Sequence, residues 1–148
     1  MRRLRRGVRD DTGSTLPLVI FFGALGLLVV LLVVAATSLY LERKRLLALA
    51  DGAALVGAEA FDLDAVDVAG TGPIAVLDDA VVASAVEEYL DTHPATGFEA
   101  LQLDAAFTPD GRSATITLSS MWRPPVVTLF VPDGIRIDVT ATARSVFG

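Results

Sequence analysis

The sequence predicts an α+β fold. A long N-terminal transmembrane helix continues into a small domain with a second helix and a three-stranded, or slightly larger, antiparallel sheet. Three observations predict this arrangement. An uncharged apolar run fills residues 16–41, a helical pattern of small residues follows it, and apolar and polar residues alternate in the last third of the chain. The 148 residues leave room for one domain besides the membrane segment.

The apolar run, LPLVIFFGALGLLVVLLVVAATSLYL, holds 26 residues without a charge. As a helix with a rise of about 1.5 Å per residue it spans roughly 39 Å, which exceeds the roughly 30 Å hydrocarbon core of a bilayer. A soluble core helix of this length would normally carry a polar stripe, and this run carries none. Ser14 or Thr15 can cap the helix, and Pro17 fits its first turn. We therefore predict a transmembrane helix over residues 16–41.

Charge is divided unequally around the run. Residues 1–45 hold eight Arg and Lys against three Asp and Glu, whereas residues 46–148 hold four against fifteen. Five arginines precede the run, so the positive-inside rule favours a cytoplasmic basic tail over residues 1–15 and an extracytoplasmic C-terminal domain, with the chain in the inner (cytoplasmic) membrane. The acidic remainder gives no electrostatic reason to bind nucleic acid. The absence of cysteine from the sequence excludes disulfides and thiol chemistry.

A cleavable secretory signal is the alternative to a retained anchor. The arginine-rich start fits the n-region of a signal, and Val34, Ala35 and Ala36 offer small residues to a signal peptidase. The apolar part of such a signal usually runs about 7 to 15 residues and ends in a helix breaker. The run here is longer and continues into helix-forming sequence, so a retained span is favoured.

A helical extension with a small-residue face is predicted over residues 42–61, beginning with a charged collar at residues 42–45. Small residues and one phenylalanine recur along one helical face, and we call this set the small-residue stripe: Ala50, Ala53, Ala54, Gly57, Ala58 and Phe61. Each glycine inside a helix costs about 1 kcal/mol relative to alanine, which close approach to another backbone can offset. We predict that the stripe is an interface for partner helices. The alternative is that alanine-rich composition simply favours helix.

Residues 62–148 are predicted to form the extracytoplasmic α+β domain. Gly-Thr-Gly-Pro punctuation makes residues 62–77 a loop, and Asp78 or Asp79 begins a helix that ends near Leu90. Three later segments alternate with a period of two, as half-buried strands do. Their apolar positions are Leu101, Leu103, Ala105 and Phe107, then Ala114, Ile116 and Leu118, then Ile135, Ile137, Val139, Ala141 and Ala143.

The connections of these strands follow from turn residues. The signal Pro-Asp-Gly-Arg at residues 109–112 joins the first two strands as a hairpin. One apolar face per strand indicates a sheet that is covered by helix on one side and exposed on the other. The run VVTLFV, residues 126–131, lies between prolines and is predicted to be a buried connector or a short strand.

Neither a catalytic nor a cofactor-binding nor a metal-binding constellation is predicted. His93 is the one histidine of the sequence, and its place beside Pro94 fits a surface turn better than a general base. Asp62, Asp64 and Asp67 are acidic, but their spacing fails the calcium loop of an EF-hand. The one tryptophan is expected in the core or at its rim, with a binding edge as the alternative. We expect a protein that is not an enzyme and takes no small-molecule substrate.

Residues 5–61 resemble the pilus-assembly proteins of the TadE/TadG type. The resemblance rests on the arginine-rich start, on the Gly13-Ser14 junction and above all on ADGAALVGA over residues 50–58. That stretch is similar to the "aaDaAALAgA" signature after the membrane helix of the TadG-like N-terminal segment. The resemblance implies a minor pilin or pseudopilin-like component of the tight-adherence (Flp) pilus apparatus, pilin-like in outline. Its implied partners are membrane lipid and other pilus-assembly or pilin-like membrane proteins.

The resemblance also implies a processing site. Some members of the wider group are cut by a prepilin peptidase at a glycine junction, which here is Gly13-Ser14. Such substrates usually carry a Glu five residues past the cut, whereas this chain has Leu18 there. That departure favours a retained anchor. A membrane-anchored binding or adhesin domain unrelated to pili is the alternative function.

Overall fold

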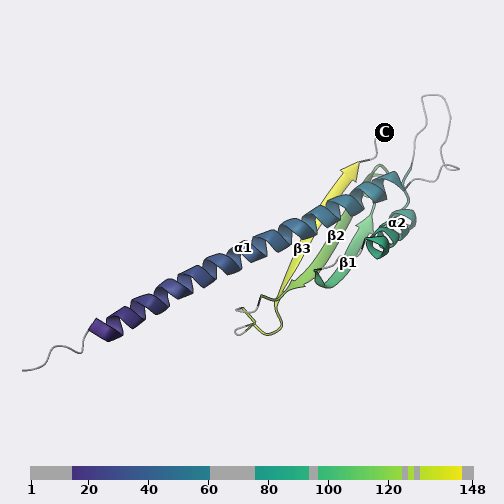
Figure 1. Ribbon diagram of the computed structural model, residues 1–148. Coiled ribbons are helices and arrows are strands. Elements are labelled where there is room, and N and C mark those ends of the chain that lie inside the picture. The colour runs from purple at the N-terminus through teal and green to yellow at the C-terminus, as the bar shows by residue number, and fades with distance from the viewer. Residues whose placement is uncertain (1–14, 61–75, 94–96, 125–126, 129–130, 145–148) are drawn as a thin grey trace, which may run out of the picture.

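The computed structural model, which describes residues 15–60, 76–93, 97–124, 127–128 and 131–144, confirms the α+β fold. Its elements are α1 (Thr15–Glu59), α2 (Asp79–Thr92), β1 (Glu99–Phe107), β2 (Ser113–Trp122) and β3 (Ile135–Arg144). The N-terminal half of α1 projects away from the other elements, and its C-terminal half lies along the sheet (Figure 1). Residues 1–14 of the predicted basic tail and residues 62–75 of the predicted loop lie outside the described residues.

Helix α1 runs without a break for 45 residues, through the charged collar and on into the small-residue stripe. At about 1.5 Å per residue its length is roughly 68 Å, about twice the hydrocarbon thickness of a bilayer. Leucine and alanine dominate the sequence around the collar, and both are strong helix formers. The prediction that the membrane helix continues to about residue 61 is confirmed as far as Glu59.

Helix α2 begins at the predicted cap and ends close to the predicted residue. The Asp78 side chain accepts a hydrogen bond from the Ala80 N–H at 2.8 Å, and Asp79 adds a negative charge to the first turn, where the helix dipole favours it. The helix ends at Thr92, two residues later than predicted, and the His93 N–H bonds to the Tyr89 carbonyl. On its apolar side Val82 and Val86 are buried, and Ala85 and Tyr89 are partly buried.

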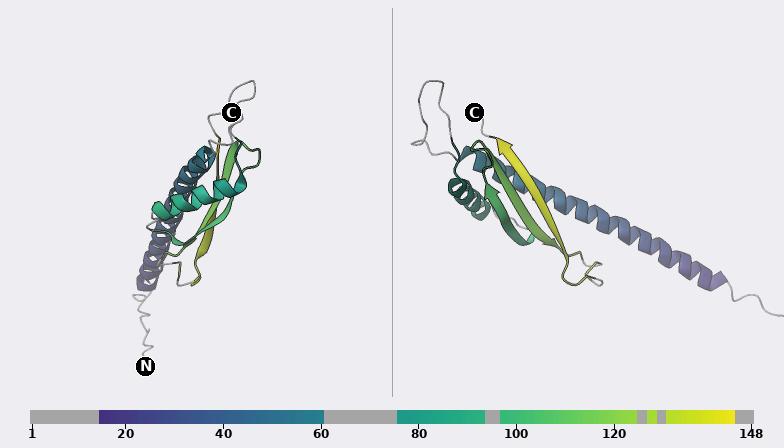
Figure 2. Two further views of the ribbon diagram at one scale, coloured as in Figure 1. Left: turned by 90° about the vertical axis from the view of Figure 1, so that its right-hand side faces the viewer. Right: turned by 180° about the vertical axis from the view of Figure 1, so that it is seen from behind.

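The three strands form one antiparallel sheet in the order β1-β2-β3. On the inner face Ala114, Ile116 and Leu118 of the central strand β2 are fully buried under the two helices. On the outer face pairs of threonine hydroxyls from β2 and β3 lie 3.1 Å apart. Figure 2 shows both helices on the same side of the sheet, so the prediction of one covered face and one exposed face is confirmed.

Strand β1 departs from the predicted alternation. Its register against β2 shifts between Leu103 and Ala105, which inserts an extra residue into β1. After this bulge Ala106 lies opposite Ile116 and packs against the core, whereas Phe107 is 40% exposed. A shift of one residue exchanges the two faces of a strand. The assignment of Ala105 and Phe107 to the apolar face is therefore wrong.

The connection between β2 and β3 also differs from its prediction. In its described part the chain makes successive turns: the Val127 N–H donates to the Pro124 carbonyl at 3.0 Å, and the Val131 N–H donates to the Val127 carbonyl at 2.8 Å. Val131 is 39% exposed. The described part of this connection is therefore neither a strand nor a fully buried connector.

Candidate functional site

The N-terminal half of α1 is an exposed apolar rod. Leucine, valine, isoleucine and phenylalanine side chains are exposed on all its sides from Leu16 to Val34. The helix contains a window of 18 residues that is apolar enough to cross a membrane, and no residue of that window is buried. By length and composition α1 alone among the described helices meets this test. The finding agrees with the predicted membrane anchor.

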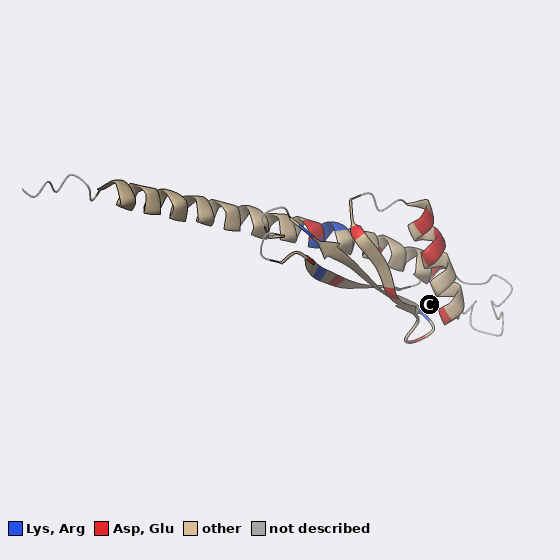
Figure 3. Cartoon of the chain, turned by 90° about the horizontal axis from the view of Figure 1, so that it is seen from below, with Lys and Arg blue, Asp and Glu red and all other residues tan. Residues whose placement is uncertain are grey.

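The charged collar, residues 42–45, lies where α1 runs alongside the sheet. Arg43, Lys44 and Arg45 are exposed, and the Lys44 ammonium lies 5.8 Å from the centre of the Tyr40 ring. In Figure 3 the basic positions of α1 colour the helix blue where it passes the sheet, and acidic positions colour parts of α2 red. Basic and aromatic residues at the end of an apolar helix are typical of a membrane–water interface.

The small-residue stripe lies at the centre of the packed domain. Four of its alanines are exposed by no more than 1%, and Gly57 is buried with them. A Cβ built on Gly57 would lie 3.1 Å from the Ala114 Cβ of β2 and 3.2 Å from a methyl group of Val82 on α2. The absence of a side chain therefore lets α1 approach the sheet and α2 at the same time.

The chain's own domain thus occupies the stripe. The prediction named partner helices as the occupant, but Ala50, Ala53, Ala54, Gly57 and Ala58 contribute to the intramolecular core. Phe61 lies outside the described residues. Contact between a partner helix and these five residues would require α2 and the sheet to move off α1. The helical spacing thus predicted which face of α1 is buried, but not which part of the protein covers that face.

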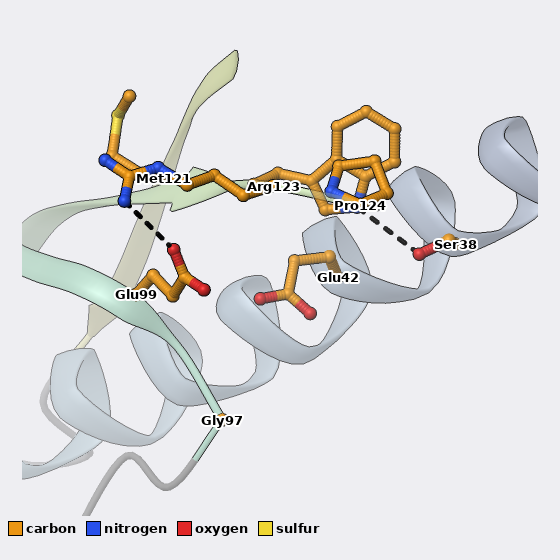
Figure 4. A pocket seen from close by; sticks show the side chains of 8 residues that line it. Ser38, Glu42, Gly97, Glu99, Met121, Arg123 and Pro124 are labelled. Atoms are coloured by element: carbon orange, nitrogen blue, oxygen red, sulfur yellow. Dashed lines mark hydrogen bonds and ion pairs between the residues drawn. The ribbon is translucent and has the colours of Figure 1, made fainter. Parts of the chain in front are cut away.

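A shallow hollow of about 180 Å³ lies between α1 and the adjoining ends of β1 and β2 (Figure 4). Glu99 and Arg123 form an ion pair across its edge at 3.4 Å, and Glu42 points toward it from α1. Both paired side chains are about half exposed, so their ion pair contributes less than about 1 kcal/mol. The ion pair joins β1 to the end of β2, and among the described lining residues no nucleophile is hydrogen-bonded to a base.

Trp122 closes this hollow from the end of β2. Its ring is 7% exposed, and its indole Nε1–H donates to the Ser38 hydroxyl of α1 at 3.3 Å. The structure therefore places the tryptophan in the core, as the sequence favours, and not at a binding edge. The same bond joins the sheet to the last part of the apolar run.

The residues weighed for chemistry do not converge. His93 is exposed, its ring stacks on Tyr89 with centroids 4.2 Å apart, and its Nδ1 lies 3.1 Å from the Tyr89 carbonyl oxygen. His93 is therefore the C-terminal cap of α2. Within the described ranges no group of three or more His, Asp or Glu side chains could hold a metal ion. Asp62, Asp64 and Asp67 lie outside the described residues.

Two carboxyl groups of the sheet have lowered pKa values, and both are structural. The backbone N–H groups of Arg112 and Ser113 donate to Asp110 at 2.9 and 2.7 Å and hold the pKa of that carboxyl below its ordinary value. A hydrogen bond from the Ser119 hydroxyl is the main cause of the lowered pKa of Asp104, and the Arg136 guanidinium lowers it further. These groups fix the β1–β2 turn and the outer face of the sheet.

Comparison with known proteins finds a family model that the N-terminal part of the chain matches. Residues 13–60 match the family model Tad, whose description is "Putative Flp pilus-assembly TadE/G-like". The match covers roughly a third of the chain and includes the Gly13-Ser14 junction, the apolar run and most of the stripe. Searches of curated proteins and of solved structures gave no match. Residues 13–60 are therefore similar to the TadE/G-like Flp pilus-assembly family, which confirms the resemblance expected from ADGAALVGA.

Proposed function

We propose that this chain is a structural, single-pass membrane component of a tight-adherence (Flp) type pilus-assembly or secretion apparatus. Its role is that of a minor pilin or pseudopilin-like protein and not of an enzyme. One observation carries the proposal: the family match over residues 13–60 coincides with α1, Thr15–Glu59. The residues that match the family model thus form a single helix. One half of this helix is apolar and exposed, and the other half packs against the domain.

The orientation follows from charge. Five arginines lie within the first nine residues, whereas three basic residues follow the apolar run, so the N-terminus is cytoplasmic and the domain extracytoplasmic. Processing at Gly13-Ser14 stays a prediction, because both residues lie outside the described part. N-terminal sequencing of the membrane-extracted chain tests it: a start at Ser14 means processing, and an intact start means a retained anchor.

The mechanism we propose is helix packing by the exposed half of α1. Its apolar side chains have no intramolecular cover within the described structure from Leu16 to Val30, so lipid or partner helices meet them. Between helices in a bilayer, association depends on van der Waals packing. The small-residue stripe then has a mechanical role: it holds the domain on α1, so that a helix captured by the apparatus carries the domain with it.

Site-specific cross-linking in piliated cells tests this mechanism, because the chain contains no cysteine of its own. Val29→Cys, Val30→Cys and Leu32→Cys sample different sides of the exposed span, and Leu55→Cys is a matched control beyond the membrane on the same helix. We expect adducts with a second membrane protein of the apparatus from at least one span position and none from Leu55→Cys.

Piliation distinguishes the parts of the proposal. Cells that lack the chain should lose pili and regain them with the unlabelled variants. Normal piliation without the chain would remove the pilus role. Loss of pili without an adduct from any span position would remove helix packing and keep the pilus role.

A further inference from the structure

The β2–β3 connection lies beside the apolar run of α1, at the end of the sheet nearest the projecting half of the helix (Figure 1). Trp122, the last residue of β2, is hydrogen-bonded to Ser38. Val127 of the connection packs against the same core cluster as Ala35 and Leu39 of α1. The domain therefore overlaps the last turns of the apolar run and does not begin above it.

Burial along α1 shows how far this overlap reaches. Ala35, Ser38, Leu39 and Glu42 are partly buried on one side of the helix, whereas residues 32–34, 36–37 and 40–41 are exposed. The overlap thus extends at least six residues before the end of the run at Leu41, which is about 9 Å along the helix.

Bilayer thickness places this overlap at the membrane surface. The run is roughly 39 Å long and the hydrocarbon core about 30 Å thick, so about 9 Å of the run lies outside the hydrocarbon. If all of that excess is on the domain side, the hydrocarbon ends near Ala35. If it is divided equally, the hydrocarbon ends near Ser38. In both cases the β2–β3 connection lies at the boundary.

The surface of the connection suits that level. The described apolar residues here form what we call the membrane-facing edge: Pro124, Val127, Val131, Pro132 and Ile135. Val131 and Ile135 are each 39% exposed. Arg43 and Arg136 line a groove with Ile135 between α1 and β3, where they lie beside Asp138. Exposed apolar side chains flanked by arginines, whose charged ends can reach the headgroups, match the interfacial layer of a bilayer.

Charge supports the same occupant. Five basic residues lie at this end of the domain: Arg43, Lys44, Arg45, Arg123 and Arg136. Five acidic residues lie at the same end, and two of them, Glu99 and Asp104, pair with Arg123 and Arg136. The other three are Glu42, Asp133 and Asp138. Helix α2, whose exposed residues include Asp79, Glu87, Glu88 and Asp91, lies toward the other end of the sheet (Figure 3). The described charges balance at this end and are purely acidic on α2, so an anionic lipid surface repels this end less than the other.

We propose that the membrane-facing edge is a second membrane contact, which rests in the interfacial layer of the leaflet that α1 leaves. Its occupant is the phospholipid surface, with Val131 and Ile135 toward the acyl-chain boundary and the Arg43 guanidinium among the headgroup phosphates. The inference rests on the membrane insertion of α1 proposed above. Two contacts fix the rotation of α1 about its axis, and so decide which side of the span partner helices meet.

Depth-dependent fluorescence quenching tests this contact on the full chain in vesicles of phosphatidylethanolamine and phosphatidylglycerol. Val131→Cys and Ile135→Cys carry an environment-sensitive fluorophore at the membrane-facing edge. Leu55→Cys, on the exposed face at the far end of α1, is the matched control, and Val30→Cys reports on the span. We expect lipids brominated near the carbonyl end of the acyl chain to quench the labels at 131 and 135 at least twofold, and the Leu55 label not at all.

The Val30→Cys label separates failure of this inference from failure of the anchor. Strong quenching at residue 30 by deeply brominated lipids, with labels at 131 and 135 as unquenched as that at 55, would overturn the second contact and keep the anchor. No quenching at residue 30 would overturn both. Two edge positions are used because one substitution could disturb the turns of the β2–β3 connection. Near-ultraviolet circular dichroism shows which labelled variants are folded.

Discussion

Gly57 of α1 and Ala114 of β2 are in such close contact that a Cβ built on the glycine would lie 3.1 Å from the Ala114 Cβ. The same Cβ would lie 3.2 and 3.4 Å from methyl groups of Val82 and Val86 of α2. One glycine therefore lies where the helix, the sheet and the second helix meet. The small side chains after the apolar run have a direct physical role, because they bring α1 close to the domain that it carries.

Replacing Gly57 with leucine should break this contact. Overfilling a packed core costs about 1–3 kcal/mol, and a side chain with three further carbons beyond the Cβ places the effect at about 3 kcal/mol or above. Denaturant unfolding in detergent, followed through the fluorescence of Trp122, measures the change in the free energy of unfolding. Glu59→Leu places the same side chain on the exposed face and should change it by less than about 0.5 kcal/mol. Equal unfolding midpoints for both variants would contradict the packing of the stripe.

Replacing Gly134 with alanine should destabilise the β2–β3 connection. Gly134 has φ +77°, and a Cβ there would lie 2.8 Å from the Trp122 carbonyl oxygen. Gly111 has a similar φ of +67°, but its added Cβ would meet only a Val76 methyl group at 3.5 Å. The left-handed backbone should lower the free energy of unfolding of both variants by about 1 kcal/mol. The clash should lower that of Gly134→Ala by about 1–3 kcal/mol more. Thermal unfolding of the two variants gives this difference, and equal melting temperatures would refute it.

Replacing Ser120 with alanine should stabilise the domain. Its side chain is 1% exposed on the inner face of β2, and the hydroxyl has no hydrogen-bond partner among the described residues. A buried polar group without a partner costs about 1–3 kcal/mol, so its removal should raise the free energy of unfolding by about 1 kcal/mol.

The neighbouring Ser119 is the matched control for that change. It faces the opposite side of the strand, is 2% exposed, and its hydroxyl bonds to the Asp104 carboxylate. Ser119→Ala should therefore destabilise by about 1 kcal/mol, opposite in sign to Ser120→Ala. Denaturant titration of the two variants measures both signs. Destabilisation by Ser120→Ala would mean that its hydroxyl has a partner.

Acid should weaken the β1–β2 turn through Asp110. Its folded-state pKa is lowered by the N–H groups of Arg112 and Ser113, so the carboxylate stabilises the fold above its unfolded pKa of about 4. That stability is lost as the pH falls through the lower, folded-state pKa. Asp110→Asn should therefore melt below the wild type at pH 6, and the gap should narrow toward pH 2.5. A gap that does not change with pH would show that the charge of Asp110 has no part in the turn.

Much of the fold could be predicted because it is local. The lack of charge over residues 16–41, the stripe spacing, the cap at Asp78 and the turn at residues 109–112 each depend on neighbours within a few positions. The bulge near Ala105 could not be predicted, since it arises from pairing with β2 and leaves a plausible alternation in the sequence. The bond from Trp122 to Ser38 joins residues 84 positions apart, and no short-range pattern signals it.

The sequence by itself determined that this chain has a membrane-length helix with a small-residue stripe beyond it, because helical and strand periodicities are properties of single segments. The same residues also carried the family resemblance. Only the tertiary structure decided that α2 and the sheet occupy the stripe, and that the β2–β3 connection lies alongside the last turns of the apolar run. The physical reason is that periodicity shows which face of a helix is buried, whereas the surface that buries it is selected by packing between distant segments.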